Sequence, residues 1–367
     1  MVAYAGWNMP THYTSITEEH NAIRNAVGIT DISHMGRLRF EGPGASVFLA
    51  ETLTRRVADL ALGQIRYSLV TNDQGGILDD VLVGRYHNAY GQPYYVLVVN
   101  AGNRAKIVRW IDQHLPPERA NRHGEEIIWD DVSCLWSMFA IQGPRSVELL
   151  QPLVDVDLNV MRYYRGAQVR ILHPAAQRQG GIISRTGYTG EDGFELVLGV
   201  DIARAVWETL YDLGQPFGIV PTGIGCRDTL RLEAGMPLYG HELTEQINPY
   251  QADLAFACHL SGYDFPGRDA LREIKKQSLK AMRVGLELDG RRVAREGAAI
   301  LLDGNKVGEV TSGTFSPTLQ KPIAMGYLRT DLAEPGTNLM VDIRGRQQSA
   351  VVVPLPFYRR PTKGGKK

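Results

Sequence analysis

The fold is decided at Gly42-Pro43-Gly44-Ala45-Ser46-Val47-Phe48-Leu49, a stretch that returns, with one residue deleted, as Gly143-Pro144-Arg145-Ser146-Val147-Glu148-Leu149. In both stretches the glycine and proline follow an apolar segment of strand length and open an amphipathic helix. A duplicated strand-and-helix unit predicts a body of two α+β lobes. Chance similarity between two short stretches is the alternative.

The C-terminal part of the chain follows a different pattern. Helical periodicity is absent, and short strand-like stretches recur at Val284–Leu288, Lys306–Thr311, Ile323–Leu328, Leu339–Ile343 and Ser349–Pro354. Asp303-Gly304 is typical of a hairpin turn. The pattern predicts a small all-β barrel or sandwich, which follows a basic, polar helix from Arg268 to about Lys280.

Composition excludes several classes of protein. The 367 residues include 40 basic and 40 acidic side chains, and this balance argues against a protein that coats nucleic acid. The cysteines, Cys134, Cys226 and Cys258, lie far apart and form neither a disulfide framework nor a Cys-x-x-Cys pair. The sequence shows no metal-ligand spacing, no secretory leader and no membrane-length apolar run. We therefore expect no metal, no membrane span and a cytoplasmic location.

Two adjacent acids interrupt an apolar strand candidate, Ile77-Leu78-Asp79-Asp80-Val81-Leu82-Val83. Side chains alternate along a strand, so Asp79 shares a face with Val81 and Asp80 shares the other face with Leu82. One carboxylate therefore lies among apolar neighbours, where an unpaired charge is costly. Two interpretations remain: a frayed strand end with both acids in solvent, or one carboxylate in a cleft for electrostatic or acid–base chemistry.

A glycine-rich loop stands at Arg185-Thr186-Gly187-Tyr188-Thr189-Gly190-Glu191-Asp192-Gly193-Phe194-Glu195. Its three glycines at three-residue spacing indicate a tight turn, and Tyr188 and Glu195 flank that turn. Glu195 is either an exposed strand residue or a carboxylate aimed at a ligand with adjacent N–H donors, such as a pterin or guanine.

A helix candidate runs from Arg227 to Met236, with Leu230 and Ala234 inward. Its charges alternate in sign along the chain. Such alternation favours a solvent-exposed face laced with salt bridges.

As a set, these motifs resemble the T-protein family of the glycine cleavage system, the tetrahydrofolate-dependent aminomethyltransferases. The resemblance covers nearly the whole chain in the family's order. Its motifs are Ala5-Gly6-Trp7-Asn8-Met9-Pro10, Asp31-Ile32-Ser33-His34-Met35-Gly36, Gly75-Gly76-Ile77-Leu78-Asp79-Asp80, Val99-Asn100-Ala101-Gly102-Asn103, the loop from Arg185 to Glu195, the segment from Arg227 to Gly240, Thr311-Ser312-Gly313-Thr314-Phe315-Ser316-Pro317 and Pro356-Phe357-Tyr358-Arg359.

The resemblance implies an α+β cloverleaf of three lobes around a central channel: two interwoven, folate-binding α+β lobes and a C-terminal all-β barrel. We expect the bilobed region to span residues 1–275, with roughly 1–50 and 141–245 in one lobe and 51–140 and 246–275 in the other. The barrel would span 276–361, and 362–367 would be a flexible basic tail.

The resemblance also implies the reaction. The one-carbon unit of an S-aminomethyldihydrolipoyl group, carried by lipoylated H-protein, passes to tetrahydrofolate, giving 5,10-methylenetetrahydrofolate and ammonia without a metal. Carried over by position, Asp80 is the catalytic residue and Glu195 holds the pterin. The remaining residues of the folate channel would be Tyr67, Asn100, Tyr188, Arg227 and Arg359.

Three positions depart from the family pattern. Ile107 follows Lys106 where the family often has aspartate, Gln251 stands in place of a usual glutamate, and Phe256 in place of a usual tryptophan. They leave open a tetrahydrofolate-dependent demethylase of a small S- or O-methyl compound on the same fold. A non-enzymatic folate-binding protein linked to iron–sulfur assembly is the other alternative, although that branch carries a cysteine motif where this chain has Thr186-Gly187-Tyr188-Thr189-Gly190-Glu191.

Overall fold

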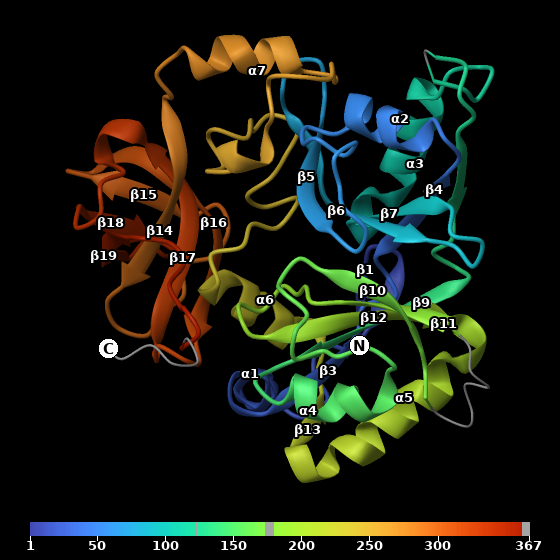
Figure 1. Ribbon diagram of the computed structural model, residues 1–367. Coiled ribbons are helices and arrows are strands. Elements are labelled where there is room, and N and C mark those ends of the chain that lie inside the picture. The colour runs from blue at the N-terminus through green and yellow to red at the C-terminus, as the bar shows by residue number, and fades with distance from the viewer. Residues whose placement is uncertain (122, 173–179, 362–367) are drawn as a thin grey trace.

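The computed structural model describes residues 1–121, 123–172 and 180–361; the expected basic tail, 362–367, lies outside them. Three lobes are visible (Figure 1): two α+β lobes, each built on one sheet, and a closed C-terminal barrel. The expected three-lobed α+β fold is therefore confirmed. Within the described residues, no helix has both the length and the apolar character needed to span a membrane.

The first lobe is built on a six-stranded sheet. The strand order is β10 (Gly166–Arg170), β11 (Gly180–Ser184), β12 (Gly193–Gly199), β9 (Trp136–Gln142), β3 (Val27–Asp31) and β13 (Ile219–Pro221). Its helices are α1 (Ile16–Asn25), α4 (Ser146–Leu150), α5 (Val200–Gly214) and α6 (Ile224–Glu233). Ser15 caps α1 by accepting a hydrogen bond from the Glu18 amide at 3.2 Å. A short N-terminal hairpin, β1 (Val2–Tyr4) and β2 (Trp7–Met9), precedes the lobe.

The second lobe is built on a five-stranded sheet. The strand order is β5 (Ile65–Thr71), β6 (Ile77–His87), β7 (Pro93–Val99), β4 (Gly36–Glu41) and β8 (Ile128–Asp131). Two helices, α2 (Ala45–Thr52) and α3 (Arg104–His114), contribute Phe48, Leu49 and Ile107 to the hydrophobic core of this lobe. Asp79 pairs with Val70 and Asp80 with Leu69 across β5 and β6, so both acids belong to a regular strand rather than to a frayed end.

The repeated glycine–proline unit has the predicted local structure in both lobes. Gly42 separates β4 from α2, and Gly143 separates β9 from α4, with φ values of 89° and 132°. A Cβ on Gly42 would lie 2.5 Å from the carbonyl oxygen of Glu126, and one on Gly143 would lie 2.4 Å from that of Ala26. Both positions therefore require glycine, which explains why the two stretches share it.

The chain crosses between the two sheets after β3 and again after β8. Arg37 holds both crossings, because its guanidinium donates to the carbonyls of Ser33 and Met35 on the first and of Ser133 and Trp136 on the second. Our expected division placed residues 1–50 in the first lobe, whereas β4 and α2 pack in the second. We propose to draw the lobe boundaries at these two crossings.

The C-terminal barrel is closed by strands in the order β14 (Ala281–Leu288), β17 (Lys321–Arg329), β16 (Asn305–Ser316), β15 (Ala299–Leu302), β18 (Asn338–Asp342) and β19 (Gln347–Val353). The basic helix before it, α7, is shorter than expected and covers Arg268–Lys275. Helix α6 lies between the barrel and the first sheet (Figure 1).

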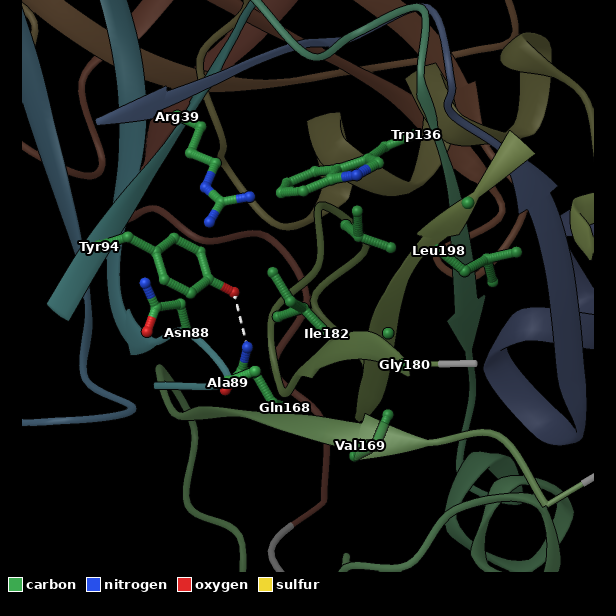
Figure 2. Close-up of a pocket in the computed structure, with 13 residues that line it drawn as sticks. Arg39, Asn88, Ala89, Tyr94, Trp136, Gln168, Val169, Gly180, Ile182 and Leu198 are labelled. Atoms are coloured by element: carbon green, nitrogen blue, oxygen red, sulfur yellow. Dashed lines mark hydrogen bonds between the residues drawn. The ribbon is translucent and has the colours of Figure 1, made fainter. Parts of the chain in front are cut away.

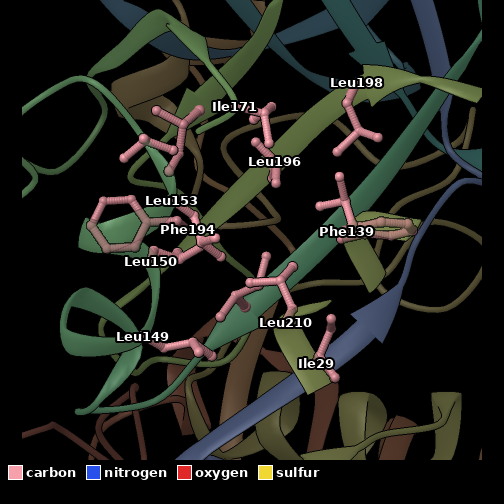
Figure 3. Packing of buried hydrophobic residues seen from close by; sticks show 14 of the residues in the cluster. Ile29, Phe139, Leu149, Leu150, Leu153, Ile171, Phe194, Leu196, Leu198 and Leu210 are labelled. Atoms are coloured by element: carbon pink, nitrogen blue, oxygen red, sulfur yellow. The ribbon is translucent and has the colours of Figure 1, made fainter. Parts of the chain in front are cut away.

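Strand alternation decides which side chains face the space between the lobes. On β12, Phe194, Leu196 and Leu198 pack into the core of the first lobe (Figure 3). Glu195 and Val197 therefore point the other way, toward the second lobe. Glu195 can face the space between the lobes because Phe194 and Leu196, on the other face of β12, hold the strand in the core of the first lobe.

Candidate active site

A cavity of about 400 Å³ lies where the three lobes meet. Six of the seven site residues implied by the resemblance line it: Tyr67, Asp80, Asn100, Tyr188, Glu195 and Arg227. The barrel contributes Arg283 to the same wall. Arg359, the seventh, is exposed and is not among the lining residues.

Asp80 presents its carboxylate to this cavity from β6. The Tyr67 hydroxyl donates to Oδ2 at 3.0 Å, and the Asn100 side-chain amide donates to Oδ1 at 2.7 Å. Burial raises the pKa of Asp80, and the hydrogen bonds from Tyr67 and Asn100 oppose that rise. Two donors thus fix the orientation of the carboxylate and favour its ionised form.

Asp79 faces the opposite side of β6, as alternation predicts, and is fully buried. Its carboxylate accepts hydrogen bonds from the Asn100 backbone amide at 3.1 Å, the Asn100 side chain at 2.8 Å and the Asn103 side chain at 2.6 Å. Burial, followed by the charge of Asp80, raises the pKa of Asp79 to about 7. Because one Asn100 nitrogen donates to both acids, the two carboxylates form a single bridged pair. Sequence periodicity gave no sign of this bridge.

Glu195 faces the cavity from β12 and is 6% exposed. Thr186 donates a hydrogen bond to one of its carboxylate oxygens. Burial raises the pKa of Glu195, while the Thr186 hydrogen bond and the charge of Arg227 lower it. Glu195 is therefore a buried residue and not the exposed strand residue of the other interpretation.

Tyr188 and Arg227 stack against each other beside the cavity. The guanidinium carbon of Arg227 lies 4.8 Å from the centroid of the Tyr188 ring, and the Tyr188 hydroxyl donates to the carbonyl of Pro237. Among the residues that the structure describes, no carboxylate forms an ion pair with Arg227. Arg227 can therefore bind an anionic group of a ligand.

The helix that carries Arg227 corrects one of our predictions. We expected a solvated charged face, but Arg231 is 2% exposed and Glu233 is fully buried. Arg231 pairs with Glu242 at 2.9 Å and donates to the Ser312 hydroxyl of the barrel at 2.8 Å. The prediction was wrong because the barrel covers this helix face, and charge alternation along a sequence carries no information about a distant lobe.

The three departures from the family pattern lie in different surroundings. Phe256 is 62% exposed and lines the cavity, where its ring stacks on that of Tyr67 with centroids 5.9 Å apart. Gln251 holds a turn by accepting a hydrogen bond from the Asn248 side chain at 2.8 Å. Ile107 is buried in the core of the second lobe. Phe256 is thus the one departure that changes the cavity wall directly.

Sequence reasoning missed His34, which lines the cavity and is 4% exposed. Burial, together with the charges of Arg227 and Arg37, lowers the pKa of His34 to about 3. The imidazole is therefore neutral at physiological pH. Its motif was visible in the sequence, but nothing in that motif indicated burial. Among residues 1–121, 123–172 and 180–361, no group of three or more His, Cys, Asp and Glu side chains is arranged to hold a metal ion.

Fold and site together define a three-lobed protein whose central cavity holds an oriented carboxylate, a second buried carboxylate opposite and an available cation. Apolar walls with a few convergent polar groups of this kind are the usual composition of a small-molecule site.

Comparison with known proteins names the family. Residues 1–262 match the GCVT N-terminal domain, and residues 282–359 match the glycine cleavage T-protein C-terminal barrel domain. The chain belongs to the glycine cleavage T-protein family, a family of tetrahydrofolate-dependent aminomethyltransferase enzymes.

Individual relatives agree over nearly the full length. The chain is 43% identical to an aminomethyltransferase of Symbiobacterium thermophilum, covering 98% of this chain and 94% of the relative. It is 42% identical to one of Saccharopolyspora erythraea, with 97% and 94% covered. The crystal structure of glycine cleavage system aminomethyltransferase T from Bartonella henselae superposes with a TM-score of 0.86 at 33% identity, covering 98% of this chain and 94% of that one.

Proposed function

We propose that this enzyme transfers the one-carbon unit of S-aminomethyldihydrolipoyl H-protein to tetrahydrofolate, giving 5,10-methylenetetrahydrofolate, ammonia and dihydrolipoyl H-protein. The observation that carries the proposal is Asp80, whose carboxylate is oriented by Tyr67 and Asn100 at the wall of a cavity formed by all three lobes. The expected location in the cytoplasm stays a prediction.

Asp80 is proposed as the catalytic residue because positive charge develops on the transferred carbon as its bond to the leaving group breaks. A preorganised carboxylate stabilises such charge without reorganising. The same carboxylate can accept a hydrogen bond from an N–H group of the folate and so orient that nitrogen for attack. The hydrogen bonds from Tyr67 and Asn100 keep the carboxylate in place while the folate arrives.

Folate recognition is proposed to start at Glu195 on the opposite wall. A carboxylate can accept two parallel N–H bonds, and the pterin ring presents adjacent N–H donors. Arg227 and Tyr188 lie beside the same cavity and would contact the remainder of the ligand. Arg359 is exposed, and its contact with the acidic tail of folate stays a prediction.

The direct test incubates the full chain with tetrahydrofolate and aminomethylated H-protein and measures ammonia release. Asp80→Asn should lower turnover by ~10²-fold or more, because the amide keeps the shape and removes the charge. Its folate dissociation constant should stay close to that of the unaltered protein. Asp73→Asn, an exposed acid in the turn before β6, is the matched control.

Two outcomes would contradict the proposal. Turnover of Asp80→Asn at the unaltered rate would remove Asp80 from the chemistry. Methyl transfer from a small thioether or aryl ether, with no ammonia released from aminomethylated H-protein, would instead establish the demethylase alternative.

A further inference from the structure

A second cavity, of about 300 Å³, opens between the two α+β lobes (Figure 2). It lies at the other end of the strands that carry the central site. Strand β6 runs from the Asp80 region to His87, just before Asn88 in the wall of this cavity, and β12 runs from Glu195 to Gly199, which also lines it. The second cavity shares none of its lining residues with the central one.

Arg39 of β4 is the cation of this cavity. Its Nε atom lies 2.8 Å from the Glu41 carboxylate, and its guanidinium carbon lies 4.5 Å from the Tyr94 ring centroid and 6.0 Å from that of Trp136. These contacts hold the guanidinium between two aromatic rings (Figure 2). Within the described part of the chain, its two terminal nitrogens have no hydrogen-bond acceptor, so the guanidinium fork is available to a ligand.

Tyr94 adds a second donor beside this fork. The ring is 3% exposed, and its hydroxyl oxygen accepts a hydrogen bond from the Gln168 side-chain amide at 3.0 Å (Figure 2). That bond occupies the oxygen as an acceptor, so the hydroxyl hydrogen remains to be donated. Burial raises the pKa of Tyr94, which keeps that hydrogen in place. The two groups therefore offer three donor positions on one side of the cavity.

Apart from the polar side chains of Asn88 and Gln168, the rest of the wall is apolar or bare backbone. Ile182 and Val197 line it, and Gly180 and Gly181 place no side chain in it. The Trp136 ring forms a further flat surface. Apolar walls with a few convergent polar groups are the usual composition of a small-molecule site.

We propose that this cavity binds a small planar carboxylate with an apolar or aromatic body. The carboxylate would lie on the terminal nitrogens of Arg39 and the Tyr94 hydroxyl, and the body against Trp136 and Ile182. A singly charged, planar group fits because Arg39 is one cation already shared with Glu41. The Glu41 carboxylate would repel a phosphate dianion more strongly than it repels a monoanion.

Such a ligand would bridge the two lobes, because Arg39 and Tyr94 belong to the second sheet and Trp136 and Ile182 to the first. Binding to the folded state alone stabilises a protein in proportion to the logarithm of ligand concentration. We therefore expect the thermal midpoint of the full chain to rise with ligand. This inference stands on the second cavity and does not depend on the proposed reaction.

The test uses 2-naphthoate as the probe in calorimetric titration of the full chain. Arg39→Met should weaken its binding by at least ~10-fold, the loss expected for a charge-assisted pair. Arg204→Met is the matched control, since Arg204 is an exposed arginine on α5, and should bind as the unaltered protein does. The neutral isostere 2-naphthamide should bind at least ~10-fold more weakly than 2-naphthoate.

A second variant keeps the proposal testable if Arg39→Met fails to fold: Trp136→Leu leaves the charge and should weaken 2-naphthoate more than acetate. Four results would overturn the inference. They are no binding of 2-naphthoate, equal binding of the amide, tighter binding of inorganic phosphate, and loss of binding in Arg227→Met with retention in Arg39→Met. The last would place the probe in the central cavity.

Discussion

Asp79→Asn should impair the enzyme although Asp79 does not line the central cavity. The Asp79 carboxylate accepts three hydrogen bonds, two from Asn100 and one from Asn103, and Asn100 in turn donates to Asp80. An asparagine side chain has only one acceptor oxygen, so its amide group would face donors. One buried donor without a partner costs about 1–3 kcal/mol, and the Asn100 side chain that orients Asp80 loosens.

The electrostatic part of the effect can be worked out from the bridge. The Asn100 nitrogen lies 2.8 Å from one Asp79 oxygen and 2.7 Å from one Asp80 oxygen, so those oxygens are at most 5.5 Å apart. Two unit charges at that separation repel by about 3 kcal/mol at an effective dielectric constant of 20, which corresponds to about two pH units. This repulsion adds to burial in raising the pKa of Asp79 to about 7, so Asp79 takes up a proton before Asp80 does as the pH falls.

The pH dependence of turnover reports the ionisation of Asp80. Catalysis needs ionised Asp80, so turnover falls as the pH drops through its pKa, and burial has raised that pKa in the unaltered protein. In Asp79→Asn the acidic limb should stay where it is, because Asp79 of the unaltered protein is already protonated in the pH range where Asp80 titrates. At its optimum, kcat should still fall by roughly 10- to 100-fold, because Asp80 is less well positioned.

The assay is ammonia release from aminomethylated H-protein between pH 5 and 9, with Asp73→Asn as the control. A purely structural role for Asp79 would lower the thermal midpoint and leave kcat unaltered. An unaltered kcat, or an acidic limb that moves, would refute the reasoning from the bridge.

Three further predictions concern affinity and stability. Glu195→Ala should raise the tetrahydrofolate dissociation constant by at least ~10-fold in calorimetric titration, because each charge-assisted hydrogen bond contributes about 1.5–3 kcal/mol; Glu208→Ala on the exposed face of α5 should not. Burial raises the pKa of Glu233, but hydrogen bonds from His20 and Ser316 and the charge of Arg24 together lower it to about 2. Ionised Glu233 should therefore contribute roughly 3 kcal/mol to the free energy of unfolding above pH 4.5, and this contribution should be lost as the pH falls toward 2. The difference in that free energy between the unaltered protein and Glu233→Gln, measured by urea unfolding, should narrow over the same range. Arg37→Met should lower the free energy of unfolding by ~3 kcal/mol or more in the same assay, since the buried guanidinium loses its four hydrogen bonds to carbonyls at both lobe crossings. A loss below ~1 kcal/mol would mean that Arg37 does not hold the crossings.

Local patterns in the sequence determined much of the fold. The two glycine–proline units and most strands of the barrel rest on interactions between residues close in the chain, and the structure has them where the sequence indicates. Alternation along β6 likewise assigned Asp79 and Asp80 to opposite faces, since that period is a property of a single strand. Six of the seven residues that the family resemblance names line the central cavity, and Arg359 does not; their roles toward folate stay predictions.

Only the tertiary structure decided what those residues contact. Asn100 joins Asp79 to Asp80 because β7 lies beside β6, and Arg231 is buried because the barrel packs against α6. The Arg39 cavity exists only where two lobes meet. Burial, shared hydrogen bonds and the pKa changes that follow depend on contacts between residues far apart in the chain. A periodic pattern within one element cannot specify such contacts, because the pattern is the same whatever packs against that element.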